Sequence, residues 1–168
     1  KDFLKHEPLN LTVEEIIERS SNVGTIKIVN NSNIDNVEEF LKKFGFGSRT
    51  GVELSGESKG SFTEYNTCKT CLSSLSIGYS INTTQYQMVK GYSIIANGGN
   101  DIQLSLLRNL DQNVNQKSII SNDLSNRLKK LLINVVEGDN GTGKSLRMSG
   151  YVIGGKTGTS RTYLEGIG

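Results

Sequence analysis

Two short motifs, far apart in the sequence, carry residue types suited to acyl transfer. The first is the Ser-Ser-Asn run at 20–22, and the second is the Lys-Thr-Gly-Thr run at 156–159. A serine hydroxyl reacts or relays a proton only when a neighbouring base takes its proton, and a lysine with a lowered pKa can do so. A second lysine nearby lowers that pKa, because like charges disfavour protonation. Together the motifs suggest a serine–lysine site.

Acyl transfer also needs backbone N–H groups aimed at the developing oxyanion. We expect Tyr151–Ile153 to form a short buried strand that leads into the 156–159 run. Glycines at 154 and 155 would let a peptide substrate approach this strand closely. The strand could therefore supply one oxyanion donor.

The first motif lies between two expected helices. Thr12–Glu15 has the form of a capping box, which predicts a helix running to about Ser20. A second helix is expected from Val23 to Val29. The run at 20–22 then falls at a break, where its side chains can point into a cleft.

Elsewhere the sequence predicts three further helices and one long irregular stretch. The helices cover 33–44, 84 to about 97, and 122–137, each followed by a glycine or glycines that would end it. The stretch 45–76 is rich in Gly, Ser and Thr and predicts loops with short extended pieces. In the helix at 122–137 the residues expected to face inward are Leu124, Leu128, Leu131, Leu132 and Val135.

Composition narrows the classes of function. The chain has 168 residues, 35% hydrophobic and 21% charged, which is typical of one globular domain. A net charge of +2, without a cluster of basic and aromatic residues, argues against a nucleic-acid partner. No apolar run approaches the ~18 residues of a membrane helix, and the start has no signal-peptide pattern. We expect any export signal or anchor to lie outside this chain.

The two cysteines form a lone C-x-x-C at Cys68 and Cys71. A zinc site would need four ligands, and His6 is the only histidine. The flanking residues do not provide the βαβ context of a redox motif. A local disulfide or two packed thiols is the favoured interpretation, and no metal or other cofactor is expected.

Residues 138–145 match the phosphate-loop pattern G-x-x-x-x-G-K-S. A true phosphate loop is followed by a helix whose N-terminus points at the phosphates. Here Gly150 comes soon after the lysine, and a strand pattern follows. We therefore favour a glycine-rich turn and keep a nucleotide-binding module as a remote alternative.

The two motifs, in this order and at this separation, resemble those of class B penicillin-binding proteins. Ser20–Gly24 is similar to the S-x-N motif in the form used by the division-specific transpeptidase, and Gly155–Thr159 to the K-T-G-T strand. The chain departs from the family at Ser80, where a glycine is usual, and at Thr84, where a proline is usual. Three intervening segments also agree with the family, namely 41–54, 76–99 and 141–144.

The resemblance implies an α/β fold of the α+β type, with a helical cluster packed against an antiparallel sheet as in penicillin-binding transpeptidases and serine β-lactamases. Residues 1–168 would form part of one transpeptidase domain. The family nucleophile lies in an upstream S-x-x-K motif, and no serine here is followed three residues later by lysine. The last strands and closing helix of the family are also expected to be missing. We therefore expect this chain alone to be inactive.

By resemblance, each motif residue has an expected role. Ser20 would relay a proton between the absent motif's lysine and Lys156, which supplies positive charge. Asn22 would bind the substrate amide and help to place the absent lysine. Thr157 and Thr159 would bind the terminal carboxylate of D-Ala-D-Ala or of a β-lactam. The N–H of Thr159 would be an oxyanion donor, and Gly158 would leave room for the substrate.

The resemblance also implies partners and a location. The implied partners are peptidoglycan stem peptides, β-lactam antibiotics and cell-division membrane proteins. The implied location is the periplasmic face of the inner membrane. D-alanyl carboxypeptidases, serine β-lactamases and β-lactam sensors share the motif logic and remain alternatives. So does a non-catalytic binding module. The Ser-Ser-Asn-Val-Gly context at 20–24 and the long stretch between motifs favour the transpeptidase.

Overall fold

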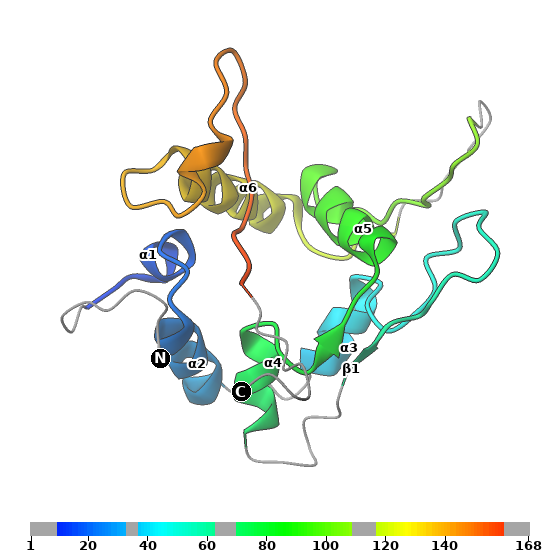
Figure 1. The fold of residues 1–168 in the computed structure, drawn as a ribbon, viewed down its shortest axis with the longest axis horizontal. Coiled ribbons are helices and arrows are strands. Elements are labelled where there is room, and N and C mark those ends of the chain that lie inside the picture. Colours follow the sequence, from blue (N-terminus) through cyan, green and yellow to red (C-terminus); the bar gives the residue numbers. More distant parts are fainter. Residues whose placement is uncertain (1–9, 33–36, 63–69, 109–116, 160–168) are drawn as a thin grey trace, which may run out of the picture.

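The computed structural model describes residues 10–32, 37–62, 70–108 and 117–159. In these ranges the regular secondary structure is mostly helical, with one two-stranded antiparallel sheet, so the expected α+β class is confirmed. Figure 1 shows the helices around the outside. The segment 147–159, drawn in orange to red, passes α6 (Asn122–Glu137) and runs toward the middle.

Two short helices open the described chain. α1 (Val13–Glu18) begins with the expected capping box: Thr12 Oγ1 accepts from the N–H of Glu15 at 3.2 Å, and Glu15 Oε2 accepts from the N–H of Thr12 at 2.8 Å. These bonds satisfy two donors that a helix start leaves unpaired. α2 (Asn22–Asn31) follows after a short break, as predicted. Next comes α3 (Val37–Lys43), within the expected range 33–44, of which 33–36 lie outside the described residues.

The expectation of loops with short extended pieces between 45 and 76 is wrong in part. β1 (Ser61–Phe62) is one of the expected short extended pieces, but α4 (Cys71–Ser76) is a helix. Four of its six residues are serine or cysteine, which are weak helix formers, and six residues are too few for a helix that is stable alone, so its stability must come from tertiary packing. α4 packs against α2, and Leu75 is buried.

The sheet consists of β1 and β2 (Ile81–Asn82). They pair antiparallel, with Ser61 opposite Asn82 and Phe62 opposite Ile81. The loop 48–60, which precedes β1, lies against the start of α5 (Gln85–Ala96), where Gln87 donates to the carbonyls of Ser48 and Lys59.

The core lies where α5 meets α6. Ile94 of α5 is fully buried and clusters with Phe44 and Ile120. α5 begins at a capping box formed by Thr84 and Gln87, so the unusual threonine at this family position still starts a helix. Partly buried side chains surround this cluster: Phe46, Ile95, Ile119 and Leu128.

The bounds of α6 match the prediction, but its inward face is rotated. Leu124 is 38% exposed, whereas Ser125 and Val136, which were not predicted to face inward, are fully buried. Val135 is fully buried, as predicted. The buried serine is tolerated because its hydroxyl donates to the carbonyl of Ile95 at 2.6 Å. Leu128, Leu131 and Leu132 are half-buried, in line with the prediction.

The expected buried strand at Tyr151–Ile153 is wrong. The segment is extended, but Tyr151 and Val152 are 69% and 75% exposed. A strand is buried only when neighbouring elements cover it, and the sheet in the described part of the chain does not include this segment. Instead the N–H of Gly155 donates to the carbonyl of Leu132 in α6 at 3.0 Å.

Candidate active site

Ser20 lies in the break between α1 and α2, in a backbone conformation that serines seldom adopt. Its φ is +56°, in the left-handed region that costs a non-glycine residue about 1 kcal/mol or more. The next residue, Ser21, is buried and caps α2, its Oγ accepting from the N–H of Gly24 at 3.0 Å. The sharp turn therefore separates two serines: one caps a helix, and the other can meet a distant partner.

Gly24 lets the two helices approach closely. A Cβ at this position would lie 2.6 Å from Cγ1 of Ile16, the buried side chain of α1. Such a contact is well inside normal packing distance. A glycine here therefore fixes how α2 leaves α1, and with it where Ser20 lies.

The structure brings Ser20 together with Lys156. Lys156 Nζ donates to Ser20 Oγ at 2.5 Å, although 136 positions separate the two residues. Nζ also donates to the carbonyl oxygen of Thr157 at 3.0 Å. The two motifs thus meet side chain to side chain, which is the contact that a proton relay needs.

Partial burial of its ammonium group lowers the pKa of Lys156. In the described chain this shift comes from loss of solvation, and the expected contribution of a second lysine, which belongs to the S-x-x-K motif outside this chain, stays a prediction. A lysine that releases its proton more readily is better suited to exchange one with a serine hydroxyl.

Thr157 is held by a residue outside both motifs. Its Oγ1 lies 2.8 Å from Oγ1 of Thr142, in the glycine-rich turn after α6. Thr142 in turn donates to the carbonyl of Glu18, at the end of α1, at 3.4 Å. No sequence signal identified Thr142 or Glu18, because their contacts exist only once α1 and α6 pack together.

The other predicted site residues do not join this contact. Asn22 is the first residue of α2 and half-buried, and its side chain has no hydrogen bond to any residue the structure describes. Apart from its two chain neighbours, no atom of the described residues lies within 4 Å of where a Cβ would stand on Gly158. Thr159, the last residue described, is exposed. Gly158 and Thr159 are exposed and Asn22 is half-buried. The roles expected for these three residues in substrate binding stay predictions.

The glycine-rich turn at 138–145 does not have the geometry of a phosphate loop. The N–H of Gly143 donates to the carbonyl of Val135 at 2.8 Å, and that of Gly141 to the carbonyl of Gly138 at 3.1 Å. Lys144 donates to the carbonyl of Asp139 within the turn. The helix that follows is the single 3-10 turn η2 (Lys144–Leu146). Donors that would face a phosphate already bind the protein itself.

Arg147 fixes this turn to the end of α6. Its guanidinium donates to the carbonyls of Val136 and Glu137 at 2.8 Å and of Gly138 at 3.1 Å. These carbonyls have no partner within the helix, and a cation is favourable at this negative end. The arginine lies too far along the chain for any helix-end signal to reveal it.

Two further predictions concern cysteine and metal. Cys71 is disulfide-bonded, which agrees with a local disulfide, while Cys68 lies outside the described residues. In the described ranges no three His, Cys, Asp or Glu side chains gather as a metal site would require. None of the helices described there is long and apolar enough to span a bilayer.

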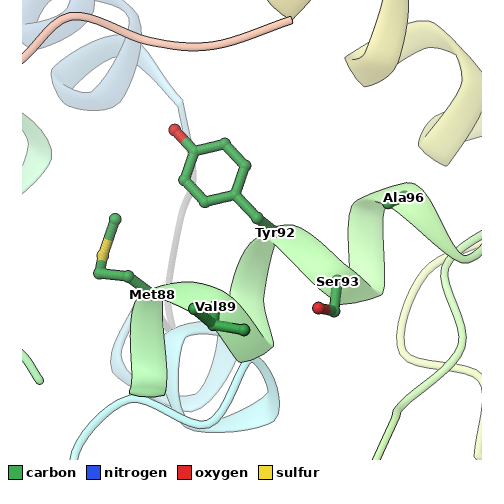
Figure 2. Close-up of a pocket in the computed structure, with 5 residues that line it drawn as sticks. All are labelled: Met88, Val89, Tyr92, Ser93 and Ala96. Atoms are coloured by element: carbon green, nitrogen blue, oxygen red, sulfur yellow. The ribbon is translucent and has the colours of Figure 1, made fainter. Parts of the chain in front are cut away.

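An apolar hollow of about 360 Å³ lies on α5, lined by Met88, Val89, Tyr92, Ser93 and Ala96. Figure 2 shows Met88 and Tyr92 projecting from the same side of α5. Burial raises the pKa of the Tyr92 hydroxyl. None of the motif residues lines this hollow, so it is separate from the serine–lysine contact.

Comparison with known proteins identifies the family. A family model of the penicillin binding protein transpeptidase domain matches residues 2–166. The chain belongs to this family. The resemblance inferred from the S-x-N and K-T-G-T motifs is therefore confirmed.

Individual transpeptidase relatives agree. Penicillin-binding protein PbpB of Mycolicibacterium smegmatis is 30% identical over 176 residues, covering 96% of this chain and 27% of the relative. Peptidoglycan D,D-transpeptidase FtsI of Buchnera aphidicola is 32% identical over 165 residues, covering 95% and 28%. Penicillin binding protein 3 from Mycobacterium tuberculosis, complexed with aztreonam, matches with a TM-score of 0.88 at 28% identity, covering 98% of this chain and 40% of that one. The chain thus spans about a quarter of the length of these sequence relatives.

Proposed function

We propose that the parent protein is a serine-type peptidoglycan D,D-transpeptidase that cross-links D-Ala-D-Ala stem peptides through an acyl-enzyme and is a target of β-lactams. The observation that carries this proposal is the hydrogen bond from Lys156 Nζ to Ser20 Oγ in a chain of the transpeptidase family. Relatives named D,D-transpeptidase and a relative complexed with aztreonam support it.

The nucleophile in this proposal comes from a part of the parent outside this chain. No serine in the sequence has a lysine three residues later, as the family's S-x-x-K motif requires. Ser20 itself accepts a hydrogen bond from Lys156, so Lys156 in this state acts on it as a donor rather than as a base. Ser20 is therefore suited to relaying a proton, not to attacking a carbonyl.

The relay follows from what each group can donate. An ammonium group only donates, so Ser20 Oγ accepts from Lys156 and its own proton is free for a second acceptor. We propose that this acceptor is the lysine of S-x-x-K. A proton can then pass toward the leaving group through Ser20 while Lys156 replaces it, which the lowered pKa of Lys156 makes easier.

Substrate binding is assigned to the open side of the same segment. Thr157 and Thr159 would hold the terminal carboxylate, and the N–H of Thr159 would face the oxyanion. The open space beside Gly158 supports a substrate lying along this stretch. Asn22, half-buried at the start of α2, would bind the substrate amide.

We also propose that the parent is membrane-anchored, acts outside the inner membrane, and works with cell-division membrane proteins. The disulfide at Cys71 supports an oxidising compartment, since disulfides persist there. The relatives FtsI and Stage V sporulation protein D support a role in division-type wall synthesis. Finding the full-length protein in the cytosolic fraction would count against this location.

The test uses the full-length parent and the isolated chain side by side. Fluorescent penicillin should label the parent covalently and leave the chain unlabelled, and intact-mass measurement should give one drug adduct. With a D-Ala-D-Ala peptide and an amino acceptor, the parent should form cross-linked product. Release of D-Ala without cross-linking would indicate a carboxypeptidase, and rapid drug turnover a β-lactamase. Labelling of the isolated chain would overturn the assignment of Ser20 as a relay.

A further inference from the structure

Thr142 lies where the two motif-bearing segments meet, although it belongs to neither motif. Its hydroxyl oxygen is 2.8 Å from that of Thr157 and 3.4 Å from the carbonyl oxygen of Glu18. Glu18 is the last residue of α1, directly before the break that holds Ser20. One hydroxyl group therefore connects the substrate-facing threonine to the helix that carries the relay serine.

The position of Thr142 does not depend on Thr157. The N–H of Asn140 donates to Glu18 Oε1 at 3.1 Å, and the N–H of Gly143 donates to the end of α6. A Cβ on Gly141 would lie 2.4 Å from the carbonyl oxygen of Val135, so the turn has little room to shift. The backbone on both sides of Thr142 is thus anchored.

The number of protons in this group restricts its hydrogen bonds. A threonine hydroxyl has one proton and two acceptor lone pairs, and the carbonyl of Glu18 can only accept. When Thr142 donates to Glu18, Thr157 must donate to Thr142 and has no proton left for an anion. When Thr142 donates to Thr157 instead, the proton of Thr157 is free.

We propose that Thr142 is a positioning residue for carboxylate recognition: carboxylate binding reverses the Thr142–Thr157 hydrogen bond, so that Thr157 donates to the carboxylate and Thr142 donates to Thr157. The proposal rests on the proposed function and deepens it. The bond given up, Thr142 to Glu18 at 3.4 Å, is long and weak. The bond gained, a hydroxyl to a carboxylate, is charge-assisted and stronger. The exchange therefore favours the bound state.

The experiment measures acylation of the full-length parent with benzylpenicillin and with its methyl ester, separating reversible affinity from the acylation rate constant. In Thr142→Val the Thr157 hydroxyl loses its described side-chain partner, which orients it toward the carboxylate. Reversible affinity for the acid should therefore fall by about tenfold, the scale of one well-aligned hydrogen bond involving a charged group. Affinity for the ester should change by less than about twofold, because the ester has no anion to recognise. Thr142→Ser should restore the acid to within about twofold of wild type, since it keeps the hydroxyl.

Ser145→Ala is the matched control. It removes a hydroxyl from the same part of the chain, where Ser145 is exposed and its side chain has no hydrogen bond to the described residues. Neither ligand should change. If Thr142→Val is partly unfolded, acid and ester will lose signal alike, so the ratio of their affinities within one variant still isolates the anion.

Three results would overturn the proposal. These are equal losses for acid and ester, a Thr142→Val variant that behaves as wild type, and a Thr142→Ser variant that fails to recover. A double substitution with Thr157→Val should cost no more for the acid than Thr157→Val alone, and additive losses would also contradict it. A wild-type parent that no β-lactam acylates would instead overturn the proposed function itself.

Discussion

Polar side chains are used in opposite ways in two regions of this molecule. One region is the loop 48–60 where it lies on α5, and the other is the contact between the break at 19–21 and the segment 156–157. Both connect parts of the chain that are distant in sequence. They differ in whether their polar groups still have hydrogen-bonding capacity to spare.

On α5 the polar groups are buried and fully occupied. Gln87 is 0% exposed, its Oε1 accepts from the N–H of Thr84, and its Nε2 donates to the carbonyls of Ser48 and Lys59 at 2.8 and 2.7 Å. Glu57 is also buried and accepts from the backbone and hydroxyl of Thr50, which lowers the pKa of its carboxyl group. Groups satisfied in this way hold structure and have nothing left for a ligand.

At the serine–lysine contact the side chains are open and only partly occupied. Ser20 accepts from Lys156 and still has its own proton to donate. The hydroxyl of Thr157 makes one hydrogen bond, to the hydroxyl of Thr142. Ser20 is held in a strained backbone conformation rather than relaxed into a helix. The comparison indicates that the loop on α5 contributes stability, whereas the serine–lysine contact keeps donors and acceptors available for reaction.

The largest expected effect is on chemistry at Lys156. Lys156→Ala in the full-length parent should slow acylation by about two to four orders of magnitude, because a relay loses most of its effect when one member is removed. The thermal midpoint should change little, since Lys156 lies at the surface with its ammonium group only partly buried. Stopped-flow acylation and thermal denaturation measure the two quantities.

Lys156→Arg is the control that keeps the positive charge but does not lose its proton. The pH dependence of acylation then shows whether the protonated form of Lys156 is the active one. If the protonated lysine is the active form, wild-type acylation should decline on the alkaline side below the range where ordinary lysines titrate, since burial lowers this pKa. In the arginine variant that alkaline decline should disappear, because arginine does not deprotonate. An unchanged alkaline limb would argue against Lys156 as its source.

The second effect is on stability at Gln87. Gln87→Ala should lower the free energy of unfolding by about 2–4 kcal/mol, because it leaves two carbonyls in the loop without their donor. Acylation by the molecules that remain folded should be close to normal. Val89→Ala, an exposed position on the same helix, should cost under about 1 kcal/mol. Urea denaturation measures the free energy of unfolding of both variants. If Gln87→Ala slowed acylation without lowering that free energy, the loop on α5 would contribute to chemistry rather than to stability.

A smaller effect is expected at Gly24. Gly24→Ala should destabilise by about 1–2 kcal/mol, because overpacking against Ile16 outweighs the gain in helix propensity. It should also slow acylation modestly, since α2 sets the position of Ser20. Ile16→Val, which removes a methyl group from the contact, should restore part of the loss in the double variant. Additive losses would contradict the close contact.

The smallest effect is expected at Ser80, which is exposed and has a φ of +62°. Ser80→Gly should stabilise by less than about 1 kcal/mol, since relief of the left-handed strain is partly offset by a more flexible unfolded chain. Ser145→Gly, at a position without positive φ, should destabilise slightly instead. Calorimetry of both variants gives the sign of each change in the free energy of unfolding. Equal signs would mean that the turn at Ser80 is not strained.

Local signals predicted the helices well. Thr12 with Glu15 and Thr84 with Gln87 form capping boxes whose partners lie three residues apart, so the sequence alone contains the whole interaction. α4 has no such signal and depends on packing against α2. The expected strand at 151–153 failed for a related reason: burial depends on neighbours that a short pattern does not specify.

The site was predictable only in part. Family motifs named Ser20 and Lys156, and the structure brings them together. The sequence marked Thr142 only as part of the family-like turn 141–144 and gave it no role, because its two partners lie 15 and 124 positions away. The contribution of desolvation to the lowered pKa of Lys156 could not be read from the sequence, because desolvation depends on the packed surroundings and not on residue type.

The contacts between α1 and the glycine-rich turn have a consequence for synthesis of the protein. Asn140, Thr142 and Lys156 reach back 122, 124 and 136 positions to Glu18 and Ser20. Closing a chain segment of that length costs about 4 kcal/mol of entropy, and it must happen before any of these bonds repays it. While a ribosome is still making residues 1–139, Ser20 has no partner at Lys156. We expect the α1–α2 break to mature last, and premature release of the chain to leave the serine motif exposed to chaperones or proteases.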